Sequence, residues 1–160
     1  MQICAKSSVW NGEEFLLVHA LGIYREITNA VNVGQKVRVR ARRRRVSPDR
    51  VGAKTIESYL LRAGWAKSKY VFSKSRVAVA VEYRGRQRAA CHAFGGIALA
   101  YAQDEIDVGV LVLVSEQRAM RLEAPRKSDE LLGGNDIVSR WEIKRLVPPT
   151  PLLVLDVAAY

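Results

Sequence analysis

The sequence predicts a mixed α/β domain in which a small mixed sheet is flanked by helices. Residues 107–114 form a continuous apolar run of strand length, which is typical of a strand buried on both faces. Residues 76–83 alternate in the manner of a second strand, and the alanine-rich residues 88–102 between the two favour a helix. Because 160 residues match the size of one domain and no linker or repeat divides them, we expect a single domain over 1–160.

The N-terminal region is expected to be helical after a short strand at 2–5. Asn11, followed three residues later by Glu14, resembles the start of a helix. Helical sequence then continues over 15–31, with a break expected near Gly22.

Sequence signals at both ends predict the next helix. Ser47 is a suitable N-cap, and Pro48 suits the first helical position. Apolar residues at helical spacing continue to Ala63, and Gly64 then provides a C-terminal cap.

The second half of the chain alternates between strands and helices. Residues 70–72 predict a short strand, and the strand over 76–83 places successive side chains on opposite faces. These two sets are Val77, Val79, Val81 and Tyr83 on one face, and Ala78, Ala80 and Glu82 on the other.

The helix over 88–102 is expected to be interrupted or weakened by Gly95 and Gly96. Beyond the buried strand at 107–114, the sequence predicts helices over 116–123 and 137–146 and a last buried strand over 152–157.

The positive charge is concentrated in two short segments. The chain holds 26 Lys and Arg against 16 Asp and Glu, a net charge of +10. Residues 36–50 contain eight basic residues and one acid, and residues 67–88 contain seven basic residues and one acid. The remainder carries 11 basic and 14 acidic residues, so the two segments account for more than the whole excess.

Such a concentration favours a polyphosphate partner, because each cation that meets a phosphate releases condensed counterions. From Lys36 to Arg42 the cations alternate with Val and Ala, which predicts an extended segment with its cations on one side. We therefore expect nucleic acid to contact Lys36, Arg38, Arg40, Arg42, Arg43, Arg44 and Arg45. An acidic membrane or protein surface, or a merely solvated face, are the alternatives.

Several stretches of the chain also resemble a known family. They are MQI and NGEEFLLVH near the start, SPDRVGAKTIESYLLRAGW, FSKSRVAVAVEY, AYAQDEIDVGVLVL, and PLLVLDVA at the end. In this order they resemble the BglII-like type II restriction endonucleases, which belong to the PD-(D/E)xK superfamily. The resemblance implies a restriction-endonuclease-like core, and it covers nearly the whole chain.

In that family a β-hairpin carries the catalytic carboxylates, which hold Mg²⁺. Aligning this chain with the family pattern puts Val71 at the Asp position and Ala80 at the Glu position, and retains only Glu82. Neither Val nor Ala can ligate a hard cation. We therefore expect no intact catalytic site and no metal or other cofactor.

The favoured hypothesis is a binding protein for double-stranded DNA on a nuclease fold that has lost cleavage. The resemblance places Lys74, Arg76, Arg84, Arg86 and Arg88 near DNA. It also implies a homodimer, or pairing with another subunit. RNA binding is a variant of the same hypothesis.

Two other functions stay open. One is a Mg²⁺-dependent endonuclease in which a displaced carboxylate, from Asp104, Glu105 or Asp107, joins Glu82. Alternatively, Asp104 and Asp107 serve turn chemistry and pair with a nearby Arg, and Glu82 neutralises Lys74 or Arg84. The other function is a scaffold or interaction subunit of a larger nucleoprotein complex.

Composition favours a cytoplasmic protein with no membrane partner. No run approaches the length of about 18 apolar residues that a transmembrane helix needs. The N-terminus shows no secretory signal pattern, and Cys4 and Cys91 provide no disulfide framework. Cys91 and His92 are two adjacent candidate ligands, but the sequence lacks the second pair of ligands that a structural zinc requires.

Overall fold

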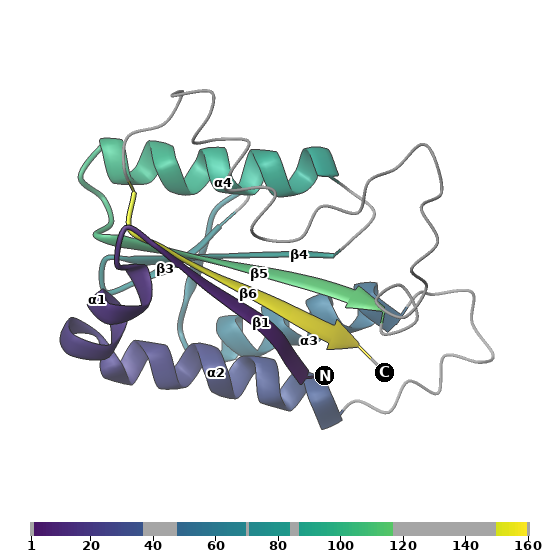
Figure 1. Cartoon of the computed structure of the whole chain (residues 1–160). Helices are drawn as coiled ribbons and strands as arrows, with labels where there is room; N and C mark the ends of the chain where they lie inside the picture. Colours follow the sequence, from purple (N-terminus) through teal and green to yellow (C-terminus); the bar gives the residue numbers. More distant parts are fainter. Residues whose placement is uncertain (1, 37–47, 70, 84–86, 117–149, 160) are drawn as a thin grey trace.

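A computed structural model describes residues 2–36, 48–69, 71–83, 87–116 and 150–159 (Figure 1). Its elements in chain order are β1 (Gln2–Val9), α1 (Gly12–His19), α2 (Leu21–Lys36), α3 (Pro48–Arg62), β2 (Ala66–Lys67), β3 (Phe72–Lys74), β4 (Val77–Tyr83), α4 (Gln87–Ala102), β5 (Val108–Glu116) and β6 (Leu152–Ala159).

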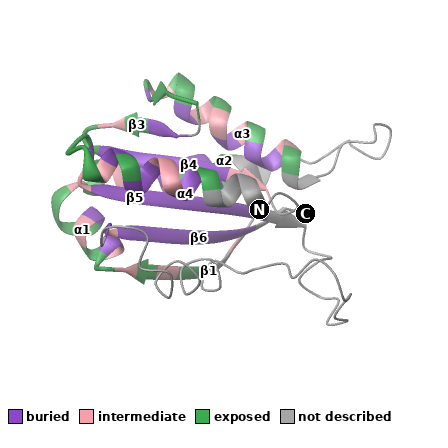
Figure 2. Cartoon of the chain, turned by 90° about the horizontal axis from the view of Figure 1, so that it is seen from above, coloured by how far each residue is buried: buried purple, intermediate pink, exposed green. Residues whose placement is uncertain are grey.

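The six strands form one mixed sheet in the order β1-β6-β5-β4-β3-β2. β2, β3 and β4 pair antiparallel, β4, β5 and β6 pair parallel, and β1 closes the other edge antiparallel to β6. Helices α1, α2 and α3 cover one face, and α4 covers the other (Figures 1 and 2). The predicted mixed α/β class, with a mixed sheet flanked by helices, is confirmed.

Each face of the sheet has its own apolar core. Val77, Val79 and Val81 of β4 pack on the side of α1, α2 and α3, whereas Ala78 and Ala80 pack on the side of α4. The predicted alternation of this strand is therefore confirmed. β5 lies between the two cores and is buried on both faces, as its apolar run predicts.

Helix α3 begins and ends as its sequence predicts. Pro48 is its first residue, and Gly64, just after its end, has a left-handed φ of 81°. The N–H of Gly64 donates to the carbonyl of Leu61 and the N–H of Trp65 to that of Leu60, both at 3.1 Å. These two bonds satisfy carbonyls that the end of the helix would otherwise leave without partners. Ser47 lies outside the described residues.

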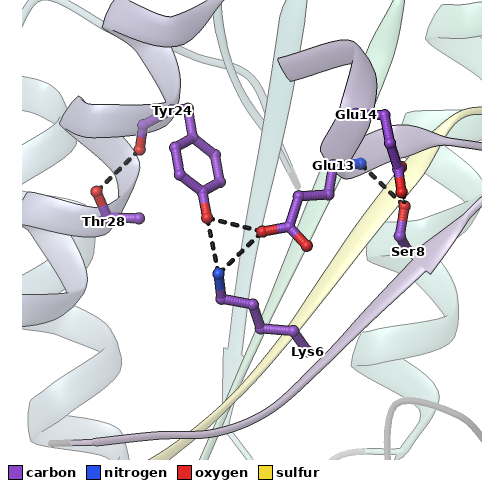
Figure 3. A network of polar contacts seen from close by, with 6 residues as sticks. All are labelled: Lys6, Ser8, Glu13, Glu14, Tyr24 and Thr28. Atoms are coloured by element: carbon purple, nitrogen blue, oxygen red, sulfur yellow. Dashed lines mark hydrogen bonds and ion pairs between the residues drawn. The ribbon is translucent and has the colours of Figure 1, made fainter. Parts of the chain in front are cut away.

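α1 starts after Asn11, as the sequence predicts, but another residue caps it. Asn11 makes no side-chain cap bond, because the chain turns through Trp10 and Asn11 in left-handed conformations. Ser8 of β1 supplies the hydroxyl instead: its Oγ accepts the N–H of Glu13 at 3.1 Å and donates to Glu14 Oε2 at 2.6 Å (Figure 3). This bond from Ser8 lowers the pKa of the Glu14 carboxyl.

A second polar group joins β1 to both neighbouring helices. Lys6 Nζ donates to Tyr24 Oη at 2.8 Å and to Glu13 Oε1 at 2.9 Å, and Tyr24 Oη donates to the same oxygen at 2.8 Å (Figure 3). The bonds to Tyr24 and Glu13 raise the pKa of Lys6, and the bond from Lys6 lowers the pKa of Glu13. The network therefore ties the edge strand to α1 and α2.

Four other features differ from expectation. β1 continues to Val9 instead of ending at residue 5, and the helix breaks at Ala20 instead of Gly22. α4 runs without interruption through Gly95 and Gly96, because packing of its apolar face on the sheet outweighs the weak helix propensity of glycine. β2, a two-residue edge strand, has no signal in the sequence.

Two groups of predictions fall wholly or partly outside the described residues. Lys36, the first residue of the predicted extended basic segment, is instead the last residue of α2, and residues 37–47 are not described. The predicted helices at 116–123 and 137–146 are likewise not described, except that Glu116 ends β5.

Gly12 permits the close approach of α1 to β6. A Cβ at this position would lie 2.3 Å from the carbonyl carbon of Leu152 and 2.5 Å from its nitrogen. Backbone atoms cannot rotate away as a side chain can. We expect Gly12→Ala to lower the free energy of unfolding by about 3 kcal/mol in urea denaturation.

Gly22 is the matched control, because a Cβ there meets nothing within 4 Å. Gly22→Ala should stabilise the protein by about 0.5–1 kcal/mol through its better helix propensity. Equal effects of the two substitutions would contradict the packing of α1 against β6.

Candidate nucleic-acid interface

The three parallel strands end together at one edge of the sheet. Tyr83 of β4, Val114 of β5 and Val157 of β6 are partners in one row across the strands. Gln2, at the start of β1, pairs with Ala158 beside the same row. We call this side of the molecule the carboxyl edge.

Three helix ends lie at the carboxyl edge. α2 ends there at Lys36, and α3 and α4 begin there at Pro48 and Gln87, on the right-hand side of both views (Figures 1 and 2). The fold therefore brings together the elements that flank both basic segments of the sequence. Segment 37–47 connects α2 to α3, and segment 84–86 connects β4 to α4.

Of the predicted nucleic-acid contacts, Lys36 and Arg88 lie in described helices at this edge, with only their backbone described. The positions that fall outside the described residues are Arg38, Arg40, Arg42, Arg43, Arg44, Arg45, Arg84 and Arg86.

Arg76 lies at the opposite end of β4, where it joins two turns. Its Nε lies 3.0 Å from both carboxylate oxygens of Asp107, its Nη2 lies 2.7 Å from Asp104 Oδ1, and its Nη1 lies 2.9 Å from the Asp104 carbonyl. Arg76 and Ser75 both have left-handed φ angles, as a tight two-residue hairpin turn requires. Hydrogen bonds to Asp107 and Asp104 raise the pKa of Arg76, and Arg76 in turn lowers the pKa of Asp107.

Lys74 is held by a second cluster at the same end. Its Nζ donates to Glu26 Oε2 of α2 at 2.9 Å and to the carbonyl of Ala63 at 2.8 Å. Trp65 Nε1 donates to the same Glu26 oxygen at 3.0 Å. One carboxylate thus connects α2, the end of α3 and the hairpin.

These contacts give both hairpin cations an internal role. Lys74 and Arg76 are neutralised by carboxylates of the protein, and they lie far from the carboxyl edge. The expectation that Asp104 and Asp107 serve a turn and pair with an Arg is confirmed. The alternative that Glu82 neutralises Lys74 is wrong, because Lys74 binds Glu26 on the other face of the sheet.

The positions that the resemblance assigns to catalytic carboxylates are part of an apolar core. Val71 and Ala80 both belong to the cluster beneath α4, which also includes Phe94 and Leu111. Ala80 is fully buried, and Val71 is 9% exposed. Glu82 follows two residues later in the same strand, half-buried and closer to the carboxyl edge.

Asp156 is a carboxylate that the sequence analysis missed. It is 8% exposed and lies in one row with Leu113 and Glu82, so its side chain and that of Glu82 are on the α4 face. An acid inside the apolar run 152–157 is the signal that could have found it.

Asp104 and Asp107 do not join Glu82 and Asp156, because they lie at the other end of the strands. Within the part of the chain that the structure describes, no three His, Cys, Asp or Glu residues are grouped to hold a metal ion. In that same part, no helix combines the length and the apolar character needed to cross a membrane.

Comparison of the sequence with models of protein families and with curated proteins finds no match.

The Arg76 contacts predict a specific pH dependence of stability. Because the folded-state pKa of Asp107 lies below its ordinary value of 3.8, the stability that this carboxylate contributes is complete above that pH. It is lost as the pH falls through the folded-state pKa. Arg76→Gln should lower the melting temperature at pH 7. The difference in melting temperature between this variant and the wild type should become smaller at pH values below about 3.8.

Thermal unfolding followed by circular dichroism measures both curves. A gap between wild type and Arg76→Gln that stays constant from neutral to acid pH would contradict the ion pair.

Proposed function

We propose that this protein binds double-stranded DNA at the carboxyl edge and does not cleave it. The observation that carries the proposal is the convergence of helix and strand ends: the elements flanking 36–50 and 84–88 all meet at this edge (Figure 1). These two segments contain eleven basic residues and one acid. A duplex is the natural partner for such a surface, because it carries one negative charge per about 1.7 Å of its axis.

The arrangement of charges supports the same proposal. Lys67, Lys74 and Arg76, which belong to the basic hairpin segment, are paired with carboxylates of other elements. Three of the seven cations of residues 67–88 are therefore engaged in ion pairs within the protein. The N-termini of α3 and α4 also lie there, and the positive ends of their dipoles favour anions.

Two observations support a nuclease-like fold that lacks the catalytic residues of a nuclease. The order of α3, the antiparallel hairpin of β3 and β4, helix α4 and the parallel strand β5 agrees with the order that the BglII-like resemblance implies. At the two family positions, Val71 and Ala80 provide apolar side chains in place of Mg²⁺ ligands. Removing carboxylates from this region also removes their repulsion of phosphates.

One observation favours an alternative function, a Mg²⁺-dependent endonuclease. Glu82 and Asp156 share a face and a row beside the carboxyl edge, separated by Leu113. Because β5 lies between their strands, the two backbone positions are about 10 Å apart, and both side chains must extend over Leu113 to share one Mg²⁺, with water completing the shell. A homodimer, or assembly with another subunit, would be compatible with either activity.

Binding to phosphates predicts strong salt dependence. With six to ten phosphate contacts, the affinity for a labelled DNA duplex should fall by roughly three to five orders of magnitude between about 50 and 200 mM salt. Replacing Arg42, Arg43, Arg44 and Arg45 by Ala should weaken binding to all sequences alike. It should also make the slope of log K against log salt shallower by about four.

The control is Arg25→Ala, which removes an exposed cation near the start of α2, about 16 Å along the helix from Lys36. It should leave the slope unchanged. A flat salt profile for the wild type would overturn the proposal. With Mg²⁺ or Mn²⁺ present the duplex should stay intact, and cleavage that Glu82→Ala abolishes would establish the endonuclease instead.

A further inference from the structure

The outer face of α3 carries a stripe of exposed basic side chains. The helix buries Ala53, Ile56 and Leu60 against the sheet. Its exposed residues are Arg50, Lys54, Ser58, Leu61 and Arg62. Ser58 follows Lys54 and Lys54 follows Arg50 by four positions, and Leu61 and Arg62 follow Ser58 by three and four, as expected of one helix face. Glu57, which lies beside this stripe, is bonded to Lys67 at 3.0 Å.

The other helices expose no comparable stripe among their described side chains. α2 exposes one cation, Arg25, among neutral residues. α1 exposes an acid, Glu14, next to apolar residues. α4 exposes His92, Leu99 and Ala102. General solubility would not require that the exposed helical cations gather on α3.

We propose that Arg50, Lys54 and Arg62 form a second row of phosphate contacts, which extends the carboxyl edge along α3. This inference rests on the proposed function. α3 begins at the carboxyl edge and runs away from it, so its stripe is continuous with the surface proposed above (Figure 1). A duplex that contacts the edge therefore also lies along this helix.

The spacing of the three cations suits a nucleic-acid strand. A rise of about 1.5 Å per residue separates Arg50 from Lys54 by about 6 Å and Lys54 from Arg62 by about 12 Å along the helix axis. A DNA strand offers one phosphate per about 3.4 Å of its axis. Each cation therefore reaches a different phosphate, and the three span several nucleotides.

The same face is poorly suited to a membrane. A helix that lies in a membrane interface inserts a broad apolar face between the lipids. α3 has its apolar face against the sheet, and on its exposed stripe Leu61 is the single large apolar side chain. Charge without accompanying apolar surface favours the phosphate backbone of nucleic acid.

Three matched substitutions test the inference. Lys54→Ala, Arg62→Ala and Arg25→Ala each remove one exposed cation from a helix surface, and each favours the helix because alanine has the highest helix propensity. The affinity of each variant for a labelled mixed-sequence DNA duplex is measured over a salt series. Lys54→Ala and Arg62→Ala should each make the slope shallower by about one, and Arg25→Ala should not change it.

The outcomes separate the inference from the proposed function. If the wild type shows no salt-dependent binding, the proposed function fails. If the wild type binds with a steep slope but all three variants match it, only the contacts along α3 are overturned. If polyglutamate displaces the wild type as effectively as unlabelled duplex does, the assignment of α3 to nucleic acid is wrong and an acidic protein surface is its partner.

Discussion

The parallel pairing of β4, β5 and β6 is the constraint on which the rest of the structure depends. A parallel pair cannot be closed by a tight turn, so the chain must cross over the sheet, and α4 makes this crossing between β4 and β5. Helices are therefore required on the faces of the sheet, and β5 is buried between two cores. The same pairing aligns the carboxyl ends of the three strands, and it thereby brings chain segments that are distant in sequence to a single edge.

Basic residues differ in their surroundings between the two ends of the sheet. At the hairpin end, Lys74 and Arg76 bind Glu26, Asp104 and Asp107, and these ion pairs join the hairpin to α2 and to the turn that precedes β5. A cation engaged in this way adds little to the field that a polyanion meets. The segments 36–50 and 84–88, whose flanking elements meet at the carboxyl edge, contain eleven basic residues and one acid. The net charge of +10 thus conceals how unevenly the charge is distributed along the sequence.

Local signals in the sequence were sufficient to predict those features that depend on residues of a single segment. Pro48 and Gly64 predicted both ends of α3, and alternation predicted the faces of β4. Contacts set by the sheet order were not predictable in this way. Lys74 and Glu26 are 48 residues apart and meet only because α2 packs near the hairpin. Ser8 caps α1 in place of Asn11 for a similar reason, since it lies on the neighbouring strand.

We propose that DNA binds at the carboxyl edge, and amide hydrogen exchange with and without a DNA duplex tests this position most directly. We predict that DNA slows exchange in the last turn of α2 and in the first turns of α3 and α4, where the flanking elements of both basic segments meet. Exchange at the hairpin turn around Ser75, and around Asp104, should stay unchanged. Protection of the hairpin turn without protection at the carboxyl edge, or an identical exchange pattern in the presence of saturating DNA, would contradict this position.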